Sequence, residues 1–302
     1  MIEISEICKS YKTTRALAGI NLHINKGELF GLIGPDGAGK TTLIRILMTL
    51  LLPDSGTATL DGINAVDAYK KIRRIVGYMP GRFSLYQDLS VEENLKFFAT
   101  VFGTSVEKNY DLIRDIYHQI EPFKTRRAGK LSGGMKQKLA LSCALIHKPK
   151  ILVLDEPTTG VDAVSRKEFW EMLKNLQQKG ITILVSTPYM DEANLCDRVA
   201  LIQKGNILDV DAPQRITEKF PRKIIQVGAK NMYRLINDLR AFKAAEAVYA
   251  FGQHAHFTGV NDQVEPIEID RYLHQKGHTE VLVEEIPAGI EDVFMNLMEQ
   301  QS

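Results

Sequence analysis

A glycine-rich segment with a lysine and a threonine at its end is the clearest chemical feature of the chain. It runs from Gly34 to Thr41 in the form G-x-x-x-x-G-K-T and follows the apolar stretch Leu29–Ile33. Glycines without a Cβ let the backbone wrap tightly and turn its N–H groups toward phosphate oxygens, and the positive end of a following helix adds to this. We therefore predict a phosphate-binding loop, in which Lys40 reaches the β- and γ-phosphates and Thr41 ligates Mg²⁺. The residues predicted to bind the triphosphate are Gly34, Pro35, Asp36, Gly37, Ala38, Gly39, Lys40, Thr41 and Thr42.

Two carboxylates end a second apolar stretch. Ile151–Leu154 leads directly into Asp155 and Glu156. Successive side chains at a strand end point to opposite sides, so the two residues can have different roles. Asp155 suits contact with Mg²⁺, and Glu156 suits a general base that polarises the attacking water. An Asp-Glu pair after a strand is more often a helix cap or a solvated turn, but the phosphate loop upstream favours the functional interpretation.

The loop and the acidic pair require strands that are buried on both faces. Leu29–Ile33, Ile151–Leu154 and Ile181–Val185 are continuous apolar runs of this kind. Predicted helices at Lys136–Ile146 and Ser165–Gln178 lie next to them in the chain. Strands that alternate with helices predict an α/β fold with a mostly parallel sheet, typical of a P-loop NTPase core.

Other segments predict additions to this core. Ile2–Ser5, Ala16–Ile24 and Thr57–Asp61 resemble alternating strands and predict an antiparallel layer at the edge. Helical periodicity dominates from Ser90 to His147, which predicts an inserted helical subdomain at about residues 82–148. The first domain is predicted to span residues 1–215.

Residues 216–302 have a different character and are predicted to form a small α+β domain. Strands and helices are expected in the order β-α-β-β-α-β, which predicts a ferredoxin-like sandwich, with one more helix at the end. The expected strands are Ile224–Val227, Ala247–Phe251, His256–Val260 and Glu280–Ile286, and the expected helices are Met232–Leu239, Ile267–Leu273 and Ile290–Met298.

The segment from Leu131 to Gln137, Leu-Ser-Gly-Gly-Met-Lys-Gln, resembles the signature sequence of ABC ATPases. It precedes Asp155–Asp162, which is similar to the second Walker motif and the D-loop of that family, and the resemblance covers about residues 1–215. It implies an ATPase subunit in which Ser132, Gly133 and Gly134 open a helix and cap the γ-phosphate of ATP bound to the opposite subunit. It further implies that Asp162 belongs to the D-loop and that Tyr11 stacks on adenine. An ordinary strand-end tyrosine is the alternative for Tyr11.

The resemblance also implies partners and a place in the cell. Tyr189–Ala193 and the ending Ile290–Phe294 are similar to the export-type branch linked to drug or antibiotic efflux. A permease and a second ATPase domain, in a homodimer or a heterodimer, are the implied partners. No leader and no apolar run of about 20 residues is present, so we expect the chain on the cytoplasmic face of the membrane, held by its permease. A net charge of +1 gives no general attraction to nucleic acid, and none is expected as a partner.

Two positions depart from the family pattern. Gly81 stands where the family has a glutamine that touches Mg²⁺ and water, and Pro188 stands where it has a histidine that contacts the γ-phosphate. Thr187 as N-cap with Pro188 at the first helical position would explain why proline is tolerated. The alternative function is therefore a low-turnover, nucleotide-gated subunit that supports hydrolysis at a partner's site. A translation or DNA-repair relative is disfavoured, because neither a second ATPase half nor a coiled-coil insertion is visible.

Overall fold

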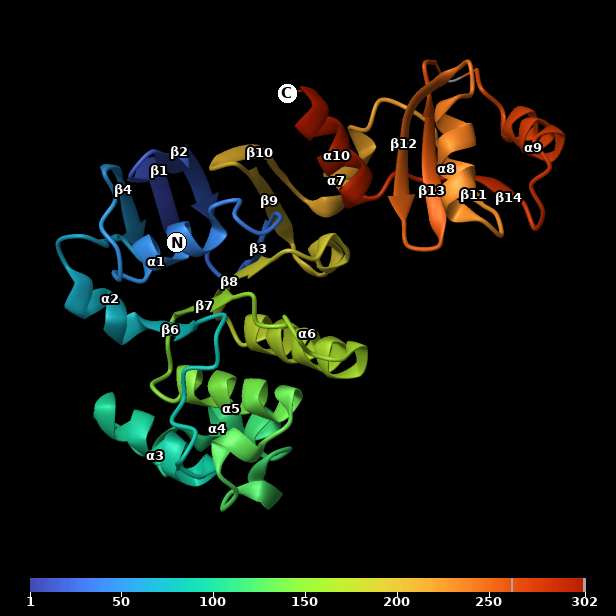
Figure 1. Cartoon of the computed structure of the whole chain (residues 1–302). Coiled ribbons are helices and arrows are strands. Elements are labelled where there is room, and N and C mark those ends of the chain that lie inside the picture. The colour runs from blue at the N-terminus through green and yellow to red at the C-terminus, as the bar shows by residue number, and fades with distance from the viewer. Residues whose placement is uncertain (262, 301–302) are drawn as a thin grey trace. The chain divides into compact units, whose positions relative to one another are not determined.

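The continuous apolar runs form the centre of a six-stranded sheet. Every residue of β3 (Leu29–Ile33), β7 (Ile151–Asp155) and β8 (Thr182–Thr187) is buried, as expected for strands covered on both faces. The computed structural model describes residues 1–261 and 263–300, and it gives the strand order β10-β9-β3-β8-β7-β6 (Figure 1). The remaining strands are β6 (Val76–Met79), β9 (Arg198–Gln203) and β10 (Asn206–Asp211).

All neighbours in this sheet are parallel except β10, which pairs antiparallel with β9 at one edge. Strands β3, β8 and β7 are adjacent, so their carboxyl ends lie side by side at one edge of the sheet. The Gly34 loop follows β3, Glu156 follows β7 and Pro188 follows β8. Parallel sheets bind ligands at this edge, and the predicted phosphate loop and acidic pair lie here.

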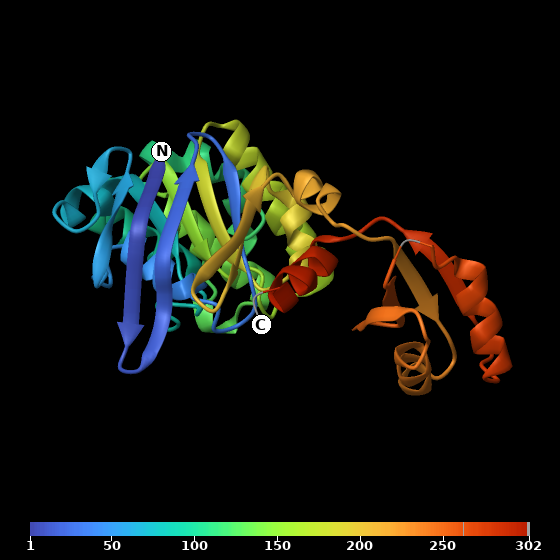
Figure 2. The ribbon, with the colours of Figure 1, turned by 90° about the horizontal axis from the view of Figure 1, so that it is seen from above.

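A second, antiparallel sheet covers the core in the order β2-β1-β4-β5. The hairpin of β1 (Ile2–Tyr11) and β2 (Thr14–Ile24) forms its long part, drawn in blue in Figure 2. Strands β4 (Ser55–Leu60) and β5 (Ile63–Asn64) extend it. One apolar cluster joins this sheet, helix α1 (Lys40–Leu47) and the central sheet, so burial fixes the phosphate loop between two rigid layers.

Helices alone make up the insertion between β6 and β7. They are α3 (Val91–Val101), α4 (Val106–Tyr117) and α5 (Gly133–Leu145), with short 3₁₀ turns at Glu121–Phe123 and Ala128–Lys130. Ser90 and Glu93 form a capping box that starts α3. Beside the sheet, α2 (Tyr69–Ile75) precedes β6 and α6 (Ala163–Gln178) follows β7, while the 3₁₀ helix η3 (Met190–Leu195) follows β8.

Contacts along the chain divide it into two units, Met1–Pro213 and Gln214–Ser302. In the second unit, four antiparallel strands take the order β12-β13-β11-β14, with elements in the chain order β-α-β-β-α-β before a last helix. They are β11 (Ile224–Gly228), α8 (Met232–Arg240), β12 (Ala245–Phe251), β13 (His254–Gly259), α9 (Pro266–Gln275), β14 (Leu282–Ile286) and α10 (Ile290–Gln300), while α7 (Pro213–Glu218) lies at the junction of the units.

The predicted fold class is confirmed: an α/β core with a mostly parallel sheet, an antiparallel layer and a C-terminal α+β region. Within residues 1–261 and 263–300, no helix has the length and apolar character needed to cross a bilayer.

Candidate nucleotide-binding site

The glycine-rich loop is held in place by backbone contacts that require glycine. The Gly34 N–H donates to the Thr187 carbonyl at 3.3 Å, which ties the loop to the end of β8. Gly39 has φ +111°, and a Cβ on it would lie 2.6 Å from the Ala16 carbonyl oxygen. A side chain at residue 39 would therefore be strained and would clash with β2, which explains the glycine just before the lysine.

Lys40 is the centre of the site. Its side chain is only 3% exposed, and Nζ donates to the carbonyl oxygens of Gly34 at 2.7 Å and Pro35 at 3.0 Å. The same ammonium lies 3.1 Å from Glu156 Oε1. One buried positive charge thus holds the loop and the acidic strand end together, and it is available to phosphate oxygens that replace these contacts.

Asp155 lies at the other side of the loop and contacts Thr41. Thr41 Oγ1 donates to Asp155 Oδ1 at 3.2 Å, and Asp155 is 3% exposed. Ser186, at the end of β8, donates from Oγ to the same carboxylate oxygen at 2.6 Å. The hydroxyl and the carboxylate are hard oxygen donors of the kind that Mg²⁺ prefers, so this donor set fits the ion. Thr42 follows in α1 and is half-buried.

Ser186 is a site residue that the sequence analysis did not identify. Besides its bond to Asp155, its carbonyl oxygen and its Oγ accept from the Glu156 N–H at 3.0 Å and 3.1 Å. Glu156 has φ +50°, a left-handed conformation, and its side chain is 23% exposed. In the sequence, Ser186 is marked only as a hydroxyl residue at the end of an apolar run. Its contact with Asp155 depends on the pairing of β7 with β8, which the local sequence does not reveal.

The signature residues lie at the start of α5. Ser132 is the N-cap, and its Oγ accepts from the Met135 N–H at 3.4 Å. Ser132 and Gly133 are exposed. No hydrogen bond or ion pair in the described residues joins Ser132–Gly134 to the phosphate loop. A single chain therefore leaves this helix end open, as a second anion-binding end would require.

Asp162 and Tyr11 are located as follows. Asp162 caps α6, where its Oδ1 accepts from the Ser165 N–H at 3.0 Å, and this bond lowers the pKa of the Asp162 carboxyl. Tyr11 ends β1, is 44% exposed and pairs with Thr14. The carbonyl oxygen of Ala16, two residues beyond Thr14, lies against Gly39, so the hairpin that ends at Tyr11 runs past the loop.

The predicted helix start at Thr187 and Pro188 is wrong. Thr187 belongs to β8, and the following helix η3 is a 3₁₀ helix that begins at Met190. Thr187 Oγ1 accepts from the Tyr189 N–H at 3.1 Å and donates to the buried Glu192 at 2.5 Å. The carboxylate of Glu192 thus engages the hydroxyl that was expected to cap a helix, and Pro188 lies in the connection instead.

Gly81 packs closely against the acidic strand end. A Cβ at this position would lie 2.9 Å from the Asp155 carbonyl oxygen and 3.8 Å from Glu156 Cβ. The first distance is shorter than real Cβ contacts, so a side chain here requires the backbone to move. The loop at Gly81 therefore lies so close to the end of β7 that the present backbone has no room for a side chain there.

A buried lysine in a glycine loop, beside two carboxylates at the end of a parallel strand, defines a P-loop nucleotide-binding protein. The family model described as ABC transporter matches residues 17–159. The chain is 38% identical over 288 residues to the probable multidrug ABC transporter ATP-binding protein YbhF of Escherichia coli, covering 94% of this chain and 49% of that protein. It therefore spans about half the length of this relative.

A second relative matches along nearly its whole length. The Nod factor export ATP-binding protein I of Burkholderia pseudomallei is 35% identical over 300 residues, which cover 98% of this chain and 96% of that protein. The chain therefore belongs to the family of ABC transporter ATP-binding proteins, and the resemblance seen in the sequence is confirmed.

Solved structures agree on the fold. The cbiO1 protein of Clostridium perfringens, part of the ABC transporter complex cbiONQ, is 28% identical with a TM-score of 0.65, covering 72% of this chain and 90% of that one. The ATP-binding cassette MJ0796, solved as a dimer with ADP and Pi, is 27% identical with a TM-score of 0.64, covering 70% of this chain and 98% of that one.

Proposed function

We propose that this chain hydrolyses ATP and thereby drives a membrane permease that exports its substrate. The observation that carries the proposal is the position of Lys40, which joins the phosphate loop to Glu156 while Thr41 contacts Asp155. The loop follows β3, Lys40 and Thr41 begin α1, and Asp155 and Glu156 lie at the end of β7. Names of relatives, a multidrug transporter protein and a Nod factor exporter, support export over import.

In this proposal each group has a distinct role. The loop N–H groups and Lys40 bind the phosphates, and Tyr11 stacks on the base. Glu156 leaves Lys40 when the γ-phosphate arrives and accepts the proton of the attacking water. Thr41 and Asp155 hold Mg²⁺, which when bound neutralises charge on the phosphates. Glu156 and the γ-phosphate compete for the Lys40 ammonium. Glu156 is therefore released from Lys40, and free to act as a base, only when a triphosphate is bound.

We further propose that two ATPase domains share each site. Ser132 and Gly133 are exposed at the N-terminus of α5, and among the described residues no hydrogen bond or ion pair joins Ser132–Gly134 to the phosphate loop of their own chain. The positive end of a helix stabilises an anion such as a γ-phosphate. A second copy, or a close relative, would bring this end to the triphosphate at Lys40, with Asp162 near the contact, and the dimeric arrangement of MJ0796 supports this assembly.

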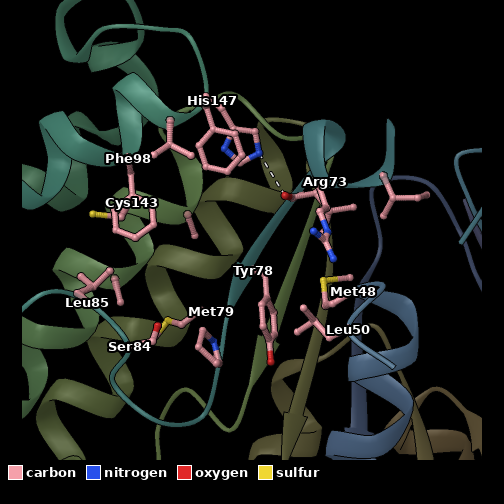
Figure 3. Close-up of a pocket in the computed structure, with 17 residues that line it drawn as sticks. Met48, Leu50, Arg73, Tyr78, Met79, Ser84, Leu85, Phe98, Cys143 and His147 are labelled. Carbon is pink, nitrogen blue, oxygen red and sulfur yellow. Dashed lines mark hydrogen bonds between the residues drawn. The ribbon is translucent and has the colours of Figure 1, made fainter. Parts of the chain in front are cut away.

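The permease is proposed to bind an apolar groove between the core and the helical insertion. Figure 3 shows Met48 and Leu50 on one wall, Phe98 and Leu85 on the other, and Tyr78 between them. The groove has a volume of about 450 Å³. Leu50 and Val101 at its edge are more than half exposed, which leaves an apolar surface suited to an amphipathic helix. The chain would then sit on the cytoplasmic face of the membrane.

The groove communicates with the site through the Gly81 loop. Met79, Pro80 and Ser84 line this groove and also a smaller cavity that contains Glu156 and Gly81. Burial, and in second place the charge of Asp155, raises the pKa of Tyr78 to about 12, so the phenol in the groove wall is neutral. A helix that moves in this groove would therefore act on the loop beside Glu156.

A charge in the groove is expected to separate the chain from its permease. In Val101→Asp, an aspartate replaces an exposed valine at the end of α3, and its desolvation opposes docking of an apolar helix. An integral membrane protein should co-purify with the wild type from detergent-solubilised membranes, and it should change the ATP turnover of the wild type. It should not co-purify with Val101→Asp. The matched control is Ile267→Asp on α9, since Ile267 is 54% and Val101 61% exposed. Equal recovery of the membrane protein with both variants would place the permease elsewhere.

A second candidate function, a low-turnover subunit that serves a partner's ATP, is favoured by Gly81 and Pro188. The Asp155 carbonyl leaves no room for a side chain at residue 81 without a backbone shift, and proline brings neither a charge nor an N–H. In that case the signature at Ser132 would act on a partner's nucleotide while the chain's own site turns over slowly.

We expect Pro188→His to raise the turnover of the homodimer by about tenfold, if the imidazole supplies about 1.4 kcal/mol at the transition state. Gly81→Gln should instead lower the melting temperature, because forcing a side chain toward the Asp155 carbonyl costs roughly 1–3 kcal/mol. Steady-state phosphate release and thermal melts measure the two effects. Brisk wild-type turnover that Pro188→His leaves unchanged would eliminate the low-turnover candidate.

A further inference from the structure

Gln137 forms a bond between the signature helix and the residue after the proposed base. It lies in the second turn of α5, and its Nε2 donates to the Pro157 carbonyl oxygen. On the N-terminal side of the Glu156 residue, its own N–H donates to the carbonyl oxygen of Ser186 at 3.0 Å and to Ser186 Oγ at 3.1 Å. The backbone that carries the Glu156 side chain is therefore held by β8 before it and by α5 after it.

This segment needs such restraint. Glu156 has φ +50°, a region that residues with a Cβ adopt only at an energetic cost and keep only when their surroundings hold them. Pro157 has no N–H to give, so its carbonyl is the only backbone hydrogen-bonding group it contributes. Removal of the bond from Gln137 would let the Glu156–Pro157 backbone relax and turn the carboxylate away from its water.

Gln137 itself gains little beyond this one bond. Its Oε1 is buried and has no hydrogen-bond partner in the described part of the chain. A buried acceptor without a partner is costly, and an apolar side chain of the same length would avoid that cost. The presence of an amide side chain at this position is therefore best explained by the hydrogen bond from its Nε2 to the Pro157 carbonyl.

Two further contacts join α5 to α6, the helix that follows Glu156 in the chain. Lys138 Nζ pairs with Glu168 Oε2 on α6 at 2.7 Å. A Cβ on Gly134 would lie 2.8 Å from Ser165 Oγ, so the start of α5 is packed against the start of α6. A shift of the signature end therefore acts on the chain that follows Glu156. The bond from Gln137 to Pro157 joins α5 to the residue next to the base.

We infer that Gln137 is a positioning residue for Glu156. When the signature helix closes on the ATP of the partner chain, Gln137 transmits this movement to the base of its own chain's site. The inference rests on the proposed function, since Ser132–Gly134 are taken to bind the partner chain's ATP. A shift of the signature helix on the partner's ATP would then move the backbone that carries the chain's own Glu156, which couples the two shared sites.

The test compares Gln137→Met with Gln177→Met in the full-length protein. Gln177 serves as the control, since it is also half-buried and its Nε2 donates to a backbone carbonyl, that of Gly27 at 3.0 Å, as well as to the Asp197 carboxylate. For Gln137→Met we expect kcat to fall about tenfold or more, as for a misplaced catalytic group, with KM within about twofold. The Gln177→Met control should keep the wild-type kcat. On a Glu156→Gln background the Gln137 substitution should have no further effect on turnover.

A second measurement does not depend on turnover. Hydrogen exchange of the Glu156 amide, followed by NMR, should be about tenfold faster in Gln137→Met than in the wild type, because a lost restraint favours local opening. Gln137→Glu, which keeps the shape without the N–H donor, should behave in the same way if the methionine variant folds poorly. Unchanged exchange in a folded variant, or equal kcat losses in the Gln137 and Gln177 variants, would overturn the inference. Absence of hydrolysis in the wild type would instead contradict the proposed function, and the exchange result would still decide the role of Gln137.

Discussion

Lys40→Ala is expected to lose MgATP binding by more than about 100-fold, because about 2.7 kcal/mol corresponds to that factor and hydrogen bonds to charged groups contribute about 1.5–3 kcal/mol each. The wild-type ammonium lies 3.1 Å from Glu156 and within 3.0 Å of two loop carbonyls. Its removal leaves those carbonyls and a carboxylate facing the phosphates, so repulsion adds to the lost attraction. Titration calorimetry with MgATP measures the change.

The fold should survive this substitution, since Lys40 is not a member of the apolar cluster that joins the two sheets. Lys150→Ala is the control: this exposed lysine pairs with Asp61 at 2.6 Å and precedes β7 at its amino end, whereas the site lies at the carboxyl end. Its loss should leave MgATP affinity unchanged. Circular dichroism and thermal melts verify that all variants are folded. Unaltered affinity in folded Lys40→Ala would exclude the phosphate loop as the nucleotide site.

Glu156→Gln is expected to convert a transient dimer into a stable one in the presence of MgATP. The substitution removes the proposed base, so ATP is not consumed, and it removes the negative charge that competes with the γ-phosphate for Lys40. Loss of a general base typically lowers the rate by about 10²–10⁴-fold. Size-exclusion chromatography with and without MgATP should show a dimer for the variant and mainly a monomer for the wild type.

Two controls test the shared site. Glu92→Gln changes a half-buried glutamate of α3 that pairs with Lys96, and it should behave as the wild type. Ser132→Arg in the Glu156→Gln background should abolish the dimer, because a bulky cation at the cap of α5 obstructs the helix end. A dimer that persists after Ser132→Arg, or a monomer in Glu156→Gln with bound MgATP, would argue against a site formed by two chains.

Much of the core was predictable because burial leaves a local trace. Strands covered on both faces read as unbroken apolar runs, so β3, β7 and β8 were expected within a residue or two of their observed bounds. Val76–Met79 was missed as a strand, because four residues that include a glycine carry little periodic signal. Helix α5 begins at Gly133 rather than at Lys136, since the Ser132 cap outweighs the poor helix propensity of two glycines.

The sequence by itself determined the chemical groups: the glycine loop with Lys40 and Thr41, the pair Asp155–Glu156 and the signature at Ser132. These are local patterns whose spacing follows from one turn or one strand end. Only the tertiary structure decided what these groups meet. The pairing of β7 with β8 brings Ser186 to the acidic pair, and the pairing of β6 with β7 brings Gly81 against the Asp155 carbonyl. Contacts between residues far apart in the chain depend on how strands pair and layers pack, and no local pattern specifies them.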